Sequence, residues 1–171
     1  AGETFSDISP DIDGGWITPY LMSPSNPQIL FAGYKEVYKS TNGALSWTTI
    51  SSGLTGNENI ECLAVAPSNN NYIYASVGHV LYKTSNGGSS WTSVTPSSSI
   101  NITGITVHNT KPQKLWICGT SGTYDMVKKS TDGGNTWTNA AGTASFTLAS
   151  RLRKTDTSAP FGHYSSAYQV R

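Results

Sequence analysis

The side chains of this sequence that could do acid–base chemistry are its ten aspartates and glutamates. Other catalytic motifs are missing: the sequence has no HExxH, CxxC, GxSxG, Walker or GxGxxG pattern. Its histidines, His79, His108 and His163, are far apart and give a zinc site no local support. Two carboxylates about 5–10 Å apart across a cleft would suit glycoside hydrolysis. We therefore expect no metal and no cofactor, and the carboxylates are the only catalytic candidates.

Cys62 and Cys118 are the only cysteines, too few to define a disulfide framework or a metal site. Two interpretations stay open for them: buried free thiols, or a bridge between adjacent structural repeats.

Charge and hydropathy limit the class of partner. The net charge is +1 and charged residues make up 12% of the chain. The basic residues are scattered, apart from a cluster at 151–154 that we interpret as a solvated tail. We therefore expect neither nucleic acid nor an acidic membrane as partner. No apolar run is long enough to be inserted in a membrane.

The neutral polar composition is typical of secreted proteins and favours a secreted or cell-surface location. The first four residues do not have the pattern of a signal peptide, and they fit a mature N-terminus or a cut end equally.

The elements that would position the carboxylates are contained in a repeat. Three eight-residue segments, Ser40–Trp47, Thr84–Trp91 and Ser130–Trp137, end in tryptophans spaced 44 and then 46 residues apart. Apolar stretches recur upstream of each segment, at Met22–Gly33 and, in the next two repeats, at 65–76 and 107–119. A period of this size predicts a repeat architecture.

The pattern predicts four short strands in each repeat. Apolar and polar residues alternate within each segment, and clusters of Pro, Asn, Gly and Ser separate the segments. No stretch shows a helical period with caps. Four strands per repeat are typical of β-propeller blades. In the second repeat the strands are expected at Ile60–Ala66, Tyr72–Val77, Val80–Thr84 and Ser90–Val94.

The eight-residue segments resemble the Asp-box, S-x-D-x-G-x-x-W, of BNR-repeat propellers. The third copy matches the signature fully, the second has Thr and Asn at its first two positions, and the first has Asn for Asp and Ala for Gly. Families with such boxes include sialidases, xyloglucanase-type glycoside hydrolases, sortilin-like receptors and a photosystem assembly factor. The signature residues are Ser40, Asn42, Ala44 and Trp47; Thr84, Asn86, Gly88 and Trp91; and Ser130, Asp132, Gly134 and Trp137.

The box predicts a structural turn between the third and fourth strands of a blade, not a catalytic site. Its Asp or Asn would accept hydrogen bonds from nearby backbone N–H groups, its Gly would allow a positive φ, and its Trp would cover the junction between strands. A positive φ at Ala44 would cost about 1 kcal/mol, so we expect a locally different turn there.

The predicted fold is an all-β propeller with about three and a half four-stranded antiparallel blades in this chain. Residues 1–141 hold three blades; residues 142–171 form a partial fourth blade or an irregular tail, with strands near Ser145–Ser150 and Tyr164–Val170. Propellers usually close with four to eight blades. The three and a half blades of this chain therefore belong to a larger propeller, close as a homodimer of about seven blades, or form a small open assembly.

The resemblance implies which residues share a ligand face. In such propellers the loops between blades lie beside the loops between second and third strands, opposite the Asp-box turns. On that face the catalytic candidates form the pairs Asp13 with Glu36 and Glu61 with Asp125, between which no spacing rule decides. The ligand-binding candidates there are Asp11, Trp16, Tyr34, Glu58, His79 and Tyr124.

Each candidate also has a structural interpretation. The acidic residues suit solvated turns, Glu36 with Lys35 suits an exposed hairpin, and Trp16 suits the core. A sialidase site is disfavoured because every arginine lies at 151 or beyond, outside the complete blades. The sequence thus predicts a secreted propeller module that binds carbohydrate or protein through its loop face. The alternative is a β-glucanase-like glycoside hydrolase, or part of one.

Overall fold

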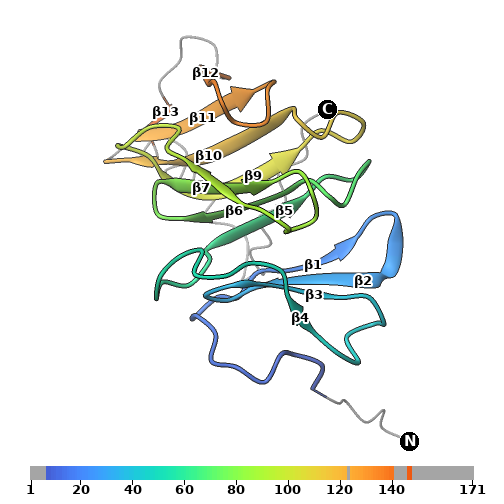
Figure 1. Cartoon of the computed structure of the whole chain (residues 1–171). Helices are drawn as coiled ribbons and strands as arrows, with labels where there is room; N and C mark the ends of the chain where they lie inside the picture. Colours follow the sequence, from blue (N-terminus) through green and yellow to red (C-terminus); the bar gives the residue numbers. More distant parts are fainter. Residues whose placement is uncertain (1–6, 123, 141–145, 148–171) are drawn as a thin grey trace, which may run out of the picture.

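The computed structural model describes residues 7–122, 124–140 and 146–147, which form strands and turns without a helix. The strands build three antiparallel sheets that follow one another in chain order (Figure 1). This is the predicted all-β arrangement of propeller blades, and closure into a ring is not seen. Of the predicted tail, 142–171, only two residues lie within the described part of the chain.

The first two sheets have four strands each, in the order of the sequence. The first sheet contains β1 (Tyr20–Ser23), β2 (Asn26–Gly33), β3 (Val37–Ser40) and β4 (Thr48–Thr49). The second contains β5 (Cys62–Val65), β6 (Ile73–Val77), β7 (Val80–Thr84) and β8 (Thr92–Val94). The strand predictions for the second repeat are confirmed, with each boundary within two residues of the expected one.

The third sheet repeats this order and gains one short strand. It contains β9 (Asn101–Val107), β10 (Leu115–Ser121), β11 (Tyr124–Ser130) and β12 (Thr138–Asn139). The additional strand, β13 (Phe146–Thr147), pairs with the beginning of β11 and therefore belongs to this sheet.

Two apolar cores join the three sheets. Successive strand residues point to opposite faces. On β5 this sends Leu63 and Val65 towards the first sheet and Ala64 towards the third. The first core adds Phe31, Val37, Ile60, Ile73, Ala75 and Val77; the second adds Ala66, Tyr74, Leu81, Ile102, Val107, Leu115 and Ile117. Strand β5 contacts both β1 and β9, so the innermost strands of the three blades adjoin.

Both cysteines are free, so the bridge between blades is not formed. Cys62 lies between the second and third sheets, with its Sγ 3.7 Å from the Ile102 carbonyl oxygen. Burial raises the pKa of this thiol above its ordinary value. Cys118 is exposed.

Candidate functional site

The third Asp-box shows how these turns are held. The Ser130 hydroxyl accepts a hydrogen bond from the Gly134 N–H at 2.7 Å and donates one to Asp132 Oδ1 at 2.7 Å. The same Oδ1 accepts the N–H groups of Asn135 and Thr136 at 3.0 and 2.9 Å. Asp132 Oδ2 accepts the Thr136 hydroxyl at 2.6 Å. Both oxygens of the carboxylate thus help to fix the turn.

The first and second boxes make the corresponding contacts. Asn42 and Asn86 use their Oδ1 atoms as Asp132 does, and their amide groups donate to the hydroxyls of Ser46 and Ser90 at 2.9 and 2.8 Å. In all three boxes the Asp or Asn side chain thus accepts backbone N–H groups of its own turn.

The prediction of a different turn at Ala44 is wrong. Ala44 has a φ of 71°, and its N–H donates to the Ser40 hydroxyl at 2.9 Å, as Gly88 does to Thr84 and Gly134 to Ser130. The hydrogen bonds that fix the turn each contribute about 1 kcal/mol, and together they outweigh the cost of the positive φ.

Two of the three box tryptophans bond to the segment of chain that precedes their own blade. The Trp91 indole N–H donates to the Ile50 carbonyl, which directly follows β4, at 2.8 Å. Trp47 donates to the Ile8 carbonyl at 2.8 Å, so the N-terminal segment occupies the place of a preceding fourth strand. Trp137 instead donates to the Gly134 carbonyl of its own box at 2.9 Å.

Asp132→Asn is expected to lower the free energy of unfolding at neutral pH, and to lower it progressively less as the pH falls below the ordinary carboxyl pKa. Hydrogen bonds from Thr136, and then Ser130, hold the pKa of Asp132 well below its ordinary 3.8. A lowered carboxyl pKa stabilises the fold above the ordinary pKa, and this contribution is lost as the pH falls through the folded-state value. Urea unfolding from pH 7 down to pH 2 measures the difference between wild type and variant.

The second box supplies the matched control, because Asn86→Asp creates the charge that the other variant removes. It should stabilise the chain at neutral pH and lose that gain in acid. A difference between Asp132→Asn and wild type that stays constant across the pH range would contradict the assignment.

The structure places Glu36 in a loop-holding position. Its carboxylate accepts the Ser51 hydroxyl through Oε2 and the Leu54 N–H through Oε1 at 3.2 Å. The Ser51 hydroxyl also accepts the Val37 N–H at 2.9 Å. Glu36 therefore ties the β2–β3 hairpin to the loop that leads into the second blade.

Hydrogen bonds of Thr55 also join the same hairpin to the rest of this loop. The Thr55 hydroxyl lies 2.8 Å from the Lys35 carbonyl and 2.5 Å from the Glu58 carbonyl. These contacts bring Tyr34, Glu36 and Glu58 into one loop cluster, with the Glu58 side chain exposed.

The structure also ties Glu61 to the β6–β7 hairpin, which carries His79. Glu61 Oε2 accepts the Gly78 N–H at 3.2 Å, and His79 is exposed. Asp11 and Asp13 are exposed in the N-terminal segment, and no hydrogen bond within the described chain links Asp13 to Glu36. Tyr124 and Asp125 begin β11, where they pair with Ser121 and Thr120.

Tyr34 is a core residue of the first blade and is 4% exposed. Its ring meets Tyr20 edge-on with centroids 6.1 Å apart, and Tyr38 at 5.7 Å. Burial, followed by a hydrogen bond with the Tyr20 hydroxyl, raises the pKa of Tyr34 well above its ordinary value. Tyr34 is therefore protonated at neutral pH.

Trp16 projects into solvent from the N-terminal segment, residues 7–19, and is fully exposed. The backbone beside it is packed closely: a Cβ at Gly14 would lie 3.1 Å from the Tyr34 ring, and one at Gly15 would lie 3.3 Å from Asn59 Cβ. The segment is anchored at its end, where the Gly33 N–H donates to the Pro19 carbonyl at 2.9 Å. The two glycines let this backbone lie against the blade while the indole points outward.

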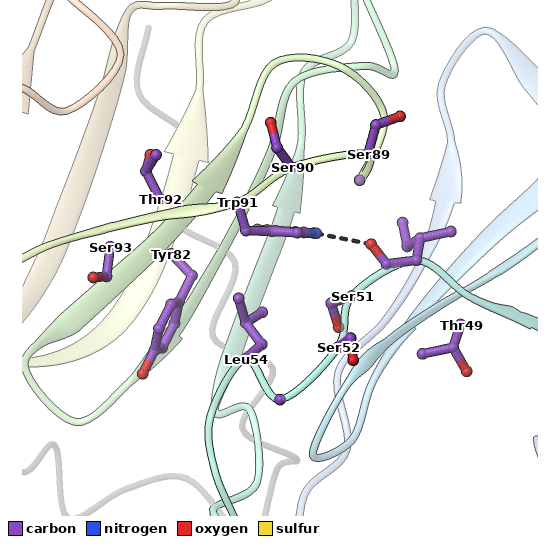
Figure 2. A pocket seen from close by; sticks show the side chains of 13 residues that line it. Thr49, Ser51, Ser52, Leu54, Tyr82, Ser89, Ser90, Trp91, Thr92 and Ser93 are labelled. Atoms are coloured by element: carbon purple, nitrogen blue, oxygen red, sulfur yellow. Dashed lines mark hydrogen bonds between the residues drawn. The ribbon is translucent and has the colours of Figure 1, made fainter.

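A groove of about 590 Å³ lies between the first and second blades. Figure 2 shows the Trp91 ring in its centre, with Leu54 and Tyr82 on one side of the ring and Ser89 and Ser90 on the other. The sequence does not predict this groove, because its residues come from two blades. The remaining lining residues are Thr49, Ile50, Ser51, Ser52, Gly53, Gly88, Thr92 and Ser93.

A second groove, of about 650 Å³, differs in charge. It lies beside the β9–β10 loop and is lined by Lys111, Lys114 and Lys129 together with Tyr72, Thr110, Pro112, Gln113 and Thr131. Within the described residues no group of three or more His, Cys, Asp or Glu side chains is placed to hold a metal ion. The described chain contains no helix long and apolar enough to cross a membrane.

Comparison with a solved β-propeller domain supports the fold. The β-propeller domain of Cps50 (Swd1) from Myceliophteria thermophila is 15% identical, with a TM-score of 0.51, over 75% of this chain and 39% of that one. The GH74 enzyme of Niastella koreensis is 21% identical, with a TM-score of 0.46, over 69% of this chain and 28% of that one. YCF48 bound to a D1 peptide is 13% identical, with a TM-score of 0.48, over 77% of this chain and 46% of that one. The chain thus spans less than half of each of these propellers.

No curated protein sequence matches the chain. A family model does: the model described as "Sortilin, neurotensin receptor 3" matches residues 2–159. Because this match covers most of the chain and the described residues form propeller blades, the chain belongs to the Sortilin-Vps10 family.

Proposed function

We propose that the chain is a receptor-type propeller module that binds a protein ligand through its N-terminal segment and does not catalyse a reaction. The observation that carries the proposal is the distribution of exposed apolar side chains. Six of the eight large apolar side chains that are exposed in the described chain belong to residues 8–22. Clustered exposed apolar residues mark interaction sites. Trp16 is 101% exposed and Ile17 75%.

The chemistry of this surface favours a protein over a glycan. Ile8, Ile12 and Ile17 are aliphatic, and a saccharide needs polar partners for its hydroxyls. Membership of the family supports the same choice, since its description names a neurotensin receptor. A secreted, cell-surface or lumenal location follows from the same proposal, and fractionation of the source cells tests it.

The carboxylates support a non-catalytic module. Glu36 and Glu61 both accept backbone N–H groups that hold loops in place. A hydrolase would instead need two carboxylates directed at the substrate. Measured hydrolysis of a soluble β-glucan that is lost in Asp13→Asn, Glu36→Gln, Glu61→Gln or Asp125→Asn would establish the alternative.

Selection of a displayed random-peptide library on the intact chain tests ligand binding. We expect enriched peptides that bind the wild type and lose about tenfold or more in affinity to the double variant Trp16→Ser, Ile17→Ser. The matched control is Leu45→Ser, which removes an equally exposed side chain, at 87%, from an Asp-box turn. Failure to enrich peptides, or equal binding to all three proteins, would refute the proposal.

Light scattering of the same samples reports whether a second copy occupies this surface. A particle of twice 18.2 kDa that dissociates in the Trp16→Ser, Ile17→Ser variant would replace the proposed ligand with a homodimer contact.

A further inference from the structure

The groove between the first and second blades has the composition of a site for an uncharged, hydroxyl-rich ligand. None of its thirteen lining residues is charged, and most carry a hydroxyl group. The hydroxyls of Thr49, Ser52, Thr92 and Ser93 make no hydrogen bond within the described chain. They are therefore free to donate to and accept from a ligand. The volume of about 590 Å³ lies within the range of small-molecule sites, roughly 300–1,000 Å³.

Aromatic rings supply the other half of the chemistry. Trp91 and Tyr82 are half-buried in the groove, beside Leu54. Aromatic rings bury large apolar areas and offer a flat face. A pyranose has such a surface in the C–H groups of its ring faces, while its hydroxyls point outward. In Figure 2 the two rings lie in the middle of the lining and the serine and threonine side chains lie around them, which matches this distribution.

The groove is formed before any ligand arrives. The Trp91 indole is fixed by its hydrogen bond to the Ile50 carbonyl. Glu36 holds the opposite wall through Ser51 and Leu54. A preformed site loses less conformational entropy on binding than a mobile one.

The groove is not a general product of the repeat. Lys128 pairs with Asn139 in the third blade as Tyr82 pairs with Ser93 in the second, so the aromatic ring is replaced by a charge. The Trp137 indole also bonds within its own box, instead of to the preceding blade. The third blade therefore lacks this pair of rings. The first blade keeps both rings, in Tyr38 and Trp47, but there the Trp47 indole bonds to the N-terminal segment and not to a preceding blade.

We propose that this groove binds a neutral saccharide chain of a few sugar units. The ligand is held by stacking on Trp91 and Tyr82 and by hydrogen bonds to the surrounding serine and threonine hydroxyls. Charged saccharides are excluded from this groove, because it offers no cation or anion to pair with them. The site is separate from the N-terminal segment and does not depend on the proposed protein ligand.

Titration of the ¹⁵N-labelled full chain with oligosaccharides tests the proposal. Cellotetraose and laminaritetraose stand for polysaccharides, a high-mannose oligosaccharide stands for glycoprotein chains, and trigalacturonate is the charged probe. We expect at least one neutral probe to shift the Trp91 indole signal and the amides of residues 49–54 and 88–93. Trigalacturonate should leave them unchanged.

Three variants decide which residues carry the binding. Tyr82→Ala should weaken it about tenfold, which corresponds to about 1.4 kcal/mol, because it removes one of the two stacking faces. Tyr82→Phe, which keeps the ring, should stay within about threefold of the wild type. Ser52→Arg places a long charged side chain in the groove from an exposed position and should abolish binding without unfolding the chain.

Three results would overturn the proposal. The first is that no neutral probe shifts the groove signals at millimolar concentration. The second is that the shifts map instead to the groove of Lys111, Lys114 and Lys129. The third is that Tyr82→Ala and Ser52→Arg bind the saccharide as the wild type does. Trp16→Ser, Ile17→Ser should bind the saccharide normally, so failure here is distinguishable from failure of the peptide selection.

Discussion

Replacing Phe31 with alanine is expected to lower the free energy of unfolding by about 3–5 kcal/mol. Phe31 is fully buried, at 0% exposure, and packs in the core between the first and second blades. The substitution removes most of a large apolar side chain and leaves a cavity that the neighbouring strands can only partly fill. Urea unfolding followed by tryptophan fluorescence measures the change.

Trp16→Ala is the control for that experiment. It also truncates an aromatic ring in the first third of the chain, but this ring is 101% exposed. Its effect should stay within about 0.5 kcal/mol, as is usual for surface positions. If both variants lost similar stability, the assigned core between these blades would be wrong.

Gly88→Ala is expected to cost about 2–5 kcal/mol, since two penalties add. Gly88 has a φ of 98°, in the left-handed region that costs other residues about 1–2 kcal/mol. A Cβ there would also lie 2.4 Å from the Ile50 carbonyl oxygen and 2.7 Å from Ile50 Cβ. Relief requires the two blades to move apart, with an overpacking cost of about 1–3 kcal/mol. The same carbonyl receives the Trp91 indole, so that hydrogen bond should weaken too.

The first box provides the matched comparison, because Ala44 already stands at the position of Gly88. Ala44→Gly removes the cost of a positive φ and also a methyl group that is only 7% exposed. These opposed terms should leave the stability within about 1 kcal/mol of the wild type. Equal effects of Gly88→Ala and Ala44→Gly in urea unfolding would show that contact with Ile50 does not decide this position.

The strands were predictable because their signal is local. In the second repeat, the consecutive apolar residues Leu63, Ala64 and Val65 indicate a strand buried on both faces without knowledge of its neighbours. The box residues are also close in sequence, so the turn follows from the motif. The failure at Ala44 has a physical cause: the sequence gives the penalty of one dihedral angle but not the sum of the hydrogen bonds that offset it.

The candidate site was less predictable because its contacts join separate blades. Nothing near Glu36 in the sequence shows that Ser51 and Leu54 fold back onto its carboxylate. The groove likewise requires that the loop at Ser52 lie opposite Tyr82 and Trp91. The Asp-box motif identified Trp91 as a signature residue. Only the positions of both blades show that a groove lies beside its ring.

The bonds of Trp47 and Trp91 give the chain a direction of assembly. In each case the indole belongs to the end of its blade and the accepting carbonyl lies 39 or 41 residues earlier. During synthesis the accepting carbonyl therefore leaves the ribosome before the indole. The hydrogen bond to the preceding segment can form once the last strand of the blade has emerged. Growth of the propeller can keep pace with translation, and stalling before Trp91 should leave the second blade protease-sensitive while the first is protected.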